Sequence, residues 1–201
     1  MRVAVKGLWN IVLSGYPRSG KTTLAKRLIA ENPKFARIGV DELREMLFNE
    51  APPCRDEFLV YSMIANMRDA LLEKGYSVVI DSTAPDNITR QFLLTTRRKL
   101  VNRLLIMLTV DRDVLIKRNI EKFGDANAVI AWDKHWQKPA GDIPVFKFKS
   151  SNILEFEVYY ARLMELLESE VHPFKPEFHL IPQPLKEIRE ALKNLLKKRN
   201  P

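Results

Sequence analysis

Short apolar runs rich in β-branched residues alternate along the chain with longer stretches in which apolar residues recur at helical spacing. The runs that predict strands are 9–14, 35–40, 76–80, 104–110 and 178–181. The stretches that predict helices are 21–30, 42–48, 55–74, one that starts near 85, 111–119, 152–169 and 185–198. In the helix at 55–74, the residues expected to share one apolar face are Leu59, Met63, Met67, Ala70 and Leu71. This alternation favours an α/β fold in which a five-stranded parallel sheet is covered by helices on both faces. With 201 residues and no internal repeat, the chain is expected to form a single domain over 1–201.

A glycine-rich stretch follows the first predicted strand. Residues 15–22, Gly-Tyr-Pro-Arg-Ser-Gly-Lys-Thr, match the phosphate-loop pattern G-x-x-x-x-G-K-[ST] without a mismatch. In such a loop, backbone N–H groups and the positive end of the following helix surround the phosphates of a nucleotide. The residues expected to bind the nucleotide are Gly15, Pro17, Arg18, Ser19, Gly20, Lys21, Thr22 and Thr23. The alternative is a glycine turn with an exposed lysine, which the flanking strand and helix disfavour.

Two further residues extend the predicted phosphate site. Lys21 is expected to reach the β- and γ-phosphates, and the Thr22 hydroxyl is expected to ligate Mg²⁺. Asp81 ends an apolar β-branched strand, as a Walker B aspartate does, and is expected to bind Mg²⁺ through water or to orient Thr22. The predicted metal residues are therefore Thr22 and Asp81.

An acidic residue also follows the second predicted strand. Ligands bind at the carboxyl ends of the strands in open α/β sheets, and Asp41 stands at such an end. Asp41 is therefore the leading candidate for a general base. The alternative is that Asp41 is simply the N-cap of the helix at 42–48.

Composition narrows the class of protein further. The chain has no apolar run of the roughly 18 residues needed to cross a bilayer and no apolar segment of a signal peptide at its start, so a cytoplasmic protein without membrane contact is expected. Cys54 is the single cysteine, and the three histidines are scattered, which excludes an internal disulfide and gives no zinc pattern. Mg²⁺ held by oxygen ligands is the expected metal.

The chain carries a formal charge of +8, from 33 basic and 25 acidic residues. Such an excess favours an anionic partner beyond the nucleotide. The alternative is a solvated, lysine-rich surface. Basic residues cluster at 97–99 with Arg103, and again at 193 and 197–199. The second cluster reads as the soluble face of a C-terminal helix.

The segment at 119–149 is the least regular and is expected to form a lid. A cationic flap over a phosphate loop neutralises charge on the transferred phosphoryl group and excludes water. Trp132 and Trp136 lie four apart and are expected to share a helix face, either as packing anchors or as platforms for a base.

Several of these motifs together carry a resemblance to a known family. The phosphate loop, Val-Asp-Glu-Leu-Arg at 40–44, Asp-Ser-Thr at 81–83 with Arg90, and Lys-Arg-Asn at 117–119 resemble the P-loop kinase group of polynucleotide 5′-hydroxyl kinases and zeta-toxin-like kinases. The resemblance covers residues 8–140 and implies the sheet order 2-3-1-4-5. It implies that Asp41 takes the proton of the acceptor hydroxyl.

The resemblance also implies roles for four cationic residues. Arg44 and Arg90 are expected to contact the acceptor, with Arg44 on its phosphate. Arg118 and Lys122 are expected to clamp the donor phosphates. The family has an arginine at the position of Lys122, and lysine makes no bidentate contact with phosphate, so the second clamp is weaker here.

These observations predict a phosphotransferase that uses ATP or GTP with Mg²⁺ and acts on a hydroxyl. Lys21, Asp41, Arg118 and Lys122 are the predicted catalytic residues. The preferred acceptor is the 5′-hydroxyl of RNA or DNA. One alternative is a small-molecule or aminoacyl-tRNA hydroxyl kinase. A nucleotide-binding switch is another, but the sequence has no evident guanine-reading N-K-x-D motif or switch glutamine.

Overall fold

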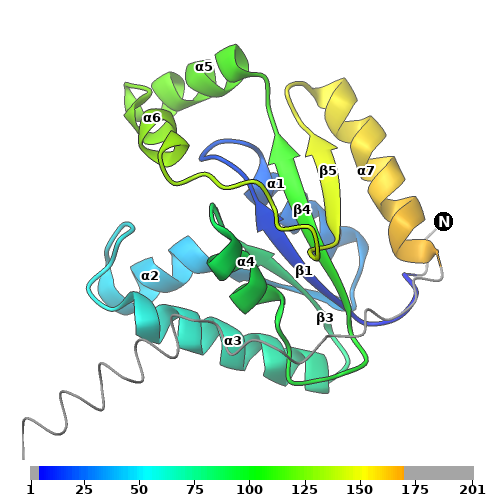
Figure 1. The fold of residues 1–201 in the computed structure, drawn as a ribbon. Helices are drawn as coiled ribbons and strands as arrows, with labels where there is room; N and C mark the ends of the chain where they lie inside the picture. Colours follow the sequence, from blue (N-terminus) through cyan, green and yellow to red (C-terminus); the bar gives the residue numbers. More distant parts are fainter. Residues whose placement is uncertain (1–4, 170–201) are drawn as a thin grey trace, which may run out of the picture.

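The computed structural model describes residues 5–169 and contains one five-stranded parallel sheet (Figure 1). Its strands are β1 (Trp9–Ser14), β2 (Phe35–Gly39), β3 (Ser77–Asp81), β4 (Asn102–Thr109) and β5 (Val145–Lys149). The strand order is β2-β3-β1-β4-β5, so the predicted order is confirmed. The central strands β1 and β3 are buried throughout, which explains why their sequences are continuous apolar runs.

Helices cover both faces of this sheet, as predicted. They are α1 (Lys21–Glu31), α2 (Val40–Phe48), α3 (Glu57–Glu73), α4 (Asn87–Leu94), α5 (Arg112–Phe123), α6 (Asn127–Asp133) and α7 (Ile153–Glu168). Leu24, Leu28 and Leu163, from α1 and α7, belong to the core on one face. Residues of α2, α3 and α4 form the core on the other face. None of the helices described is both long and apolar enough to span a membrane.

The fifth strand lies elsewhere in the chain than the sequence predicted. Val145–Lys149 pairs with β4 at the edge of the sheet, in the segment assigned to the lid. Its lysines alternate with apolar residues, a pattern typical of an edge strand with one solvated face. The predicted strand at 178–181, the helix at 185–198 and the basic cluster at 193–199 lie outside the described residues.

Two helices also differ from their predicted form. The helix that carries Arg118 continues to Phe123 and ends at Gly124, whose φ of 84° is the left-handed conformation that closes many helices. In α3 the buried apolar residues are Val60, Ile64 and Leu72, whereas the predicted face included Leu59 and Met67, which are each 41% exposed. The helix was predicted correctly, but its rotation was not.

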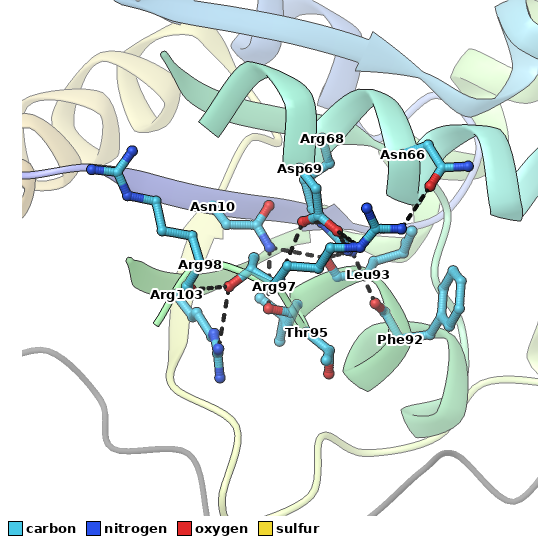
Figure 2. Close-up of polar contacts among 12 residues, drawn as sticks. Asn10, Asn66, Arg68, Asp69, Phe92, Leu93, Thr95, Arg97, Arg98 and Arg103 are labelled. Carbon is cyan, nitrogen blue, oxygen red and sulfur yellow. Dashed lines mark hydrogen bonds and ion pairs between the residues drawn. The ribbon is translucent and has the colours of Figure 1, made fainter. Parts of the chain in front are cut away.

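A polar cluster ties α3 and α4 together at the end of the sheet opposite the phosphate loop (Figure 2). The buried Arg68 guanidinium group makes two bonds to Asp69, at 3.0 and 3.1 Å, and donates to the carbonyl oxygens of Phe92 and Leu93 at the end of α4. Arg98 donates to the carbonyl oxygen of Leu72 near the end of α3. These cations satisfy carbonyl groups that a helix leaves unpaired at its C-terminus.

Candidate functional site

The phosphate loop joins the buried end of β1 to the start of α1. Gly20 precedes the helix with a φ of 96° and provides no side-chain cap for the first N–H groups of α1. A Cβ atom at Gly15 would lie 2.6 Å from the Ser19 Oγ atom, so this position needs glycine. Arg18 also has a positive φ, of 67°. The loop therefore turns sharply at the carboxyl end of β1 and leaves the first N–H groups of α1 without a side-chain cap. Such N–H groups can bind an anion.

Lys21 lies folded back over this loop. Its Nζ atom donates to the carbonyl oxygens of Gly15 and Tyr16, both at 2.8 Å. Burial lowers the pKa of Lys21 to about 8, and the nearby carboxylates of Asp81 and Asp41 oppose that shift. An ammonium group held this way is short of counter-charge, which favours an anionic ligand in the loop.

The predicted metal residues are in direct contact. The Thr22 Oγ1 atom donates to the Asp81 Oδ2 atom at 2.7 Å. The same Oδ2 atom accepts from Arg37 Nη2 at 2.6 Å and Nε at 3.1 Å. Gly39 on β2 lies opposite Asp81 on β3, so Arg37 reaches the carboxylate from the neighbouring strand. Arg37 also bonds to Glu42.

Asp41 lies in the first turn of α2 and reaches into the same space. The N-cap of α2 is Gly39, not Asp41, so the interpretation of Asp41 as a helix cap is wrong. Its Oδ1 atom accepts from Arg44 Nη1 at 2.5 Å. The Arg44 guanidinium group in turn makes two bonds to Glu57, at 2.9 and 2.8 Å. The Asp41 side chain is 69% exposed, so it is open to a ligand.

A cavity of about 1590 Å³ joins these groups. Pro17, Arg18, Gly20, Lys21, Thr22 and Thr23 line it from the phosphate loop and α1. Asp41, Arg44 and Glu57 line it from α2 and α3, Asp81 lines it at the end of β3 beside Thr22, and Arg118 lines it from α5. Most of the residues predicted to act on the two substrates therefore face one shared space. Gly15 and Ser19 of the loop do not line it, and Ser19 is buried.

The segment at 119–149, which was predicted to form a lid, contacts the phosphate loop. Tyr16 of the loop donates its hydroxyl to the Asp133 Oδ1 atom at 2.8 Å, and Asp133 makes two bonds to Arg112. The Trp136 ring stacks on the Tyr16 ring with 4.6 Å between centroids. Helix α6 ends at Asp133, so Trp132 and Trp136 do not share a helix face. Trp136 packs on the loop, whereas Trp132 lines the cavity.

The two predicted clamp residues on α5 have different positions. Arg118 lines the cavity and donates from Nη2 to the carbonyl oxygen of Ser151 at 2.8 Å. Lys122, one turn further along α5, is exposed and does not line the cavity. The structure therefore brings Arg118 to the phosphate loop but not Lys122.

Arg90 does not line the cavity either. Its fully buried side chain donates to the carbonyl oxygens of Ala84 at 2.8 Å and Gln137 at 2.7 Å. Its guanidinium group also lies 5.3 Å from the ring centre of Trp136. Arg90 therefore joins α4 to the segment at 119–149. Because its side chain is buried and does not line the cavity, we remove Arg90 from the predicted acceptor-binding residues.

Sequence reasoning missed Arg37, Glu57 and Tyr16. Arg37 becomes relevant because β2 and β3 are neighbours, a pairing given by the sheet order that the resemblance implied. Glu57 and Arg44 are 13 residues apart on different helices, and no sequence spacing links them. Tyr16 occupies a variable position of the loop pattern, so the pattern assigns it no role.

The phosphate loop between β1 and α1, the contact of Thr22 with Asp81 and the sheet order define a P-loop nucleotide-binding protein of the kinase-like type. A family model described as an AAA domain, AAA_33, matches residues 11–136. The chain belongs to this family of P-loop kinases.

Solved structures of other proteins share the fold. A sugar kinase from Janibacter sp. is 17% identical, with a TM-score of 0.64 over 80% of this chain and 95% of its own. A gluconokinase from Sinorhizobium meliloti is 20% identical, with a TM-score of 0.57 over 82% and 98%. A chain of the Pnkp1/Rnl/Hen1 complex is 25% identical, with a TM-score of 0.51 over 56% of this chain and 39% of its own.

Proposed function

We propose that the protein is a kinase that transfers the γ-phosphate of ATP to an acceptor hydroxyl. The observation that carries this proposal is that Lys21 and Thr22 of the phosphate loop and α1, and Asp41 of α2, line one shared cavity. A nucleotide switch needs the phosphate loop but has no use for an exposed carboxylate that lines the same cavity. Kinase structures among the similar folds are consistent with this assignment.

The donor phosphates would lie on the uncapped start of α1. Lys21 would exchange its two carbonyl partners for phosphate oxygens, and Arg118 would neutralise charge from the lid side. The Thr22 hydroxyl and the Asp81 carboxylate would hold Mg²⁺, since both are hard oxygen ligands and lie 2.7 Å apart at the loop. Bound there, Mg²⁺ would neutralise charge on the β- and γ-phosphates.

Asp41 would act on the acceptor. Its carboxylate would orient the acceptor hydroxyl and take its proton as the acceptor oxygen bonds to the γ-phosphorus. The bond from the γ-phosphorus to the bridging oxygen would break, and ADP would leave with that electron pair. Arg44 holds the Asp41 Oδ1 atom at 2.5 Å and would keep the carboxylate in place.

The sequence favoured a 5′-hydroxyl of RNA or DNA as acceptor, on the strength of the basic excess and of Arg44. In the structure the Arg44 guanidinium group is paired with the carboxylates of Asp41 and Glu57, so it gives no support for an acceptor phosphate. The proposal therefore keeps a hydroxyl group as the acceptor but does not include RNA or DNA.

Transfer from γ-labelled ATP to a panel of hydroxyl compounds tests this function. The panel contains 5′-hydroxyl oligonucleotides, tRNA and small alcohols. We expect labelled product that requires Mg²⁺ and disappears in EDTA. Lys21→Ala should abolish transfer because the donor phosphates lose their ammonium partner, and its melting curve should stay cooperative. Near-normal transfer by this variant, or undiminished transfer in EDTA, would contradict the proposal.

A further inference from the structure

The charges that line the cavity are segregated by element. Towards α1, α5 and the phosphate loop the charged lining is mainly cationic: Arg18, Lys21, Arg27 and Arg118. The acidic residues on this side are Asp81, which bonds to Thr22, and Glu157 of α7, which bonds to Arg27. Towards α2, α3 and α4 it is mainly anionic: Asp41, Glu42, Glu45, Glu57 and Asp86. Arg44 is the one Lys or Arg that those three helices contribute to the described lining. We call the surface made by these five carboxylates and Arg44 the acidic wall.

Arg44 does not offset the acidic wall for an incoming anion. Its bonds to Glu57 are bidentate, at 2.9 and 2.8 Å, and its third bond goes to Asp41. Arg44 is buried, whereas Asp41 is largely exposed. An anionic acceptor would have to break this paired arrangement and then face the released carboxylates.

Of the two basic clusters that suggested an anionic acceptor, the one in the described residues lies away from the cavity. Arg97, Arg98 and Arg103 gather around the start of β4, which pairs with the first residue of β1. The phosphate loop follows the last residue of β1, so this basic cluster and the cavity lie at opposite ends of the sheet. Arg97 contacts Asn66 and Asp69 (Figure 2). Arg98 donates to the carbonyl oxygen of Leu72 in α3, and Arg103 donates to the Thr96 hydroxyl. Their charge therefore gives no support for an anion at the acidic wall.

We propose that the acceptor is a hydroxyl compound without phosphate or another anionic group, either uncharged or carrying an amine that is protonated at neutral pH. This inference rests on the proposed kinase function. It assigns the acidic wall as the determinant of acceptor charge: the wall attracts cations, tolerates neutral polyols and repels phosphate-bearing molecules. Within it, Arg44 is a positioning residue for Asp41, and Glu57 fixes Arg44.

Two acceptor series that differ only in charge test the proposal. One contains glycerol, 2-amino-1,3-propanediol and glycerol 1-phosphate, and the other glucose, glucosamine and glucose 6-phosphate. A 5′-hydroxyl RNA decamer is added to both. With γ-labelled ATP and Mg²⁺, we expect label in the neutral or amine-bearing compounds and none in the phosphate-bearing compounds or the RNA.

A matched pair of variants separates charge from positioning. Glu45→Gln and Glu57→Gln each remove one negative charge from the acidic wall, but only Glu57 bonds to Arg44. Both should raise the KM of the amine-bearing acceptor about threefold relative to the neutral acceptor. Glu57→Gln should also lower kcat for both acceptors, because Arg44 no longer fixes Asp41. The KM of ATP should stay unchanged in both variants.

The distribution of label among the acceptors tests the acceptor class and the kinase function separately. Label in the RNA or in a phosphate-bearing acceptor would overturn the inference and leave the kinase function standing. Label in no acceptor, from protein that binds ATP with Mg²⁺, would overturn both. A KM ratio of amine-bearing to neutral acceptor that neither variant moves would show that the acidic wall does not select charge.

Discussion

The contacts of Lys21 show why the phosphate loop favours an anion. The loop surrounds its ammonium group with backbone, and two carbonyl oxygens at 2.8 Å take the place of water. Carbonyl groups are neutral, so they satisfy the N–H donors without balancing the charge. A nucleotide phosphate would supply the missing negative charge. Burying the charged ammonium group of Lys21 lowers the stability of the folded protein, and the size of this loss depends on pH because the group can lose its proton.

The pH dependence of stability tests this description of Lys21. The ordinary pKa of Lys21 is 10.5, and burial lowers it to about 8 in the folded protein. Between these values the unfolded chain holds a proton that the folded chain has lost, so stability rises with pH in this window. We expect the free energy of unfolding of the wild type to increase by roughly 2–3 kcal/mol relative to Lys21→Met between pH 7.5 and 10.5.

Urea denaturation of both proteins across this range measures the difference, and changes at other titrating groups cancel in the comparison. If the difference in unfolding free energy between the wild type and Lys21→Met stays constant with pH, the Lys21 ammonium group is well solvated in the folded protein.

Among the elements, the helices α3 and α4 depend on a buried ion pair. Arg68 and Asp69 are each 4% exposed, and Arg68 also bonds to two carbonyl groups at the end of α4. Breaking one partner of a buried pair leaves an uncompensated charge, which costs about 3–5 kcal/mol. Asp69→Asn should therefore lower the free energy of unfolding by roughly that amount.

Arg97→Ala is the matched control for this pair. Arg97 also contacts Asp69, at 3.5 Å, but its side chain is 71% exposed. An exposed pair contributes at most about 1 kcal/mol, so this variant should be close to wild type in urea denaturation. Equal losses of unfolding free energy for Asp69→Asn and Arg97→Ala would contradict the importance of burial.

The double variant of Arg68→Met with Asp69→Asn should lose less unfolding free energy than the two single variants combined, since it leaves no unpaired charge.

Elements with a strong local signal were predicted from the sequence. The central strands are fully buried and therefore read as apolar runs, and the caps of α4 and α7 follow from Asp86 and Asn152, whose side chains accept from Thr89 and Glu155. The edge strand β5 was missed because its lysines interrupt the apolar run, and a run at 178–181 matched the pattern better. The rotation of α3 was missed because Arg68 and Asp69, both charged, lie on its buried side.

For the site, the sequence predicted the groups that belong to a contiguous motif. The phosphate loop needs only local chain geometry, so its residues were found together. The partners of Asp81 and Arg44 come from other elements, and their contacts depend on sheet order and helix packing. Lys122 was assigned by resemblance, and the continuation of α5 to Phe123 leaves it exposed away from the cavity.

Across the whole molecule, the formal charge of +8 is a poor guide to the site. Among the described residues, cations line the proposed donor side of the cavity, carboxylates line the proposed acceptor side, and a separate group of arginines bonds to α3 and α4 at the far end of the sheet. Electrostatic recognition depends on the local potential rather than on the total. The proposed acceptor class therefore follows from the cavity and not from the composition.

In the proposed reaction, Asp41 acts on the acceptor hydroxyl while the phosphate loop binds the nucleotide. Asp41→Asn separates these two roles, since asparagine keeps the oxygen that accepts from Arg44 but loses the base. We predict that transfer from γ-labelled ATP falls by roughly 10²–10⁴-fold, while the Kd for ATP with Mg²⁺, measured on the same protein, changes less than about twofold. A parallel loss of nucleotide affinity, or transfer at the wild-type rate, would contradict the role assigned to Asp41.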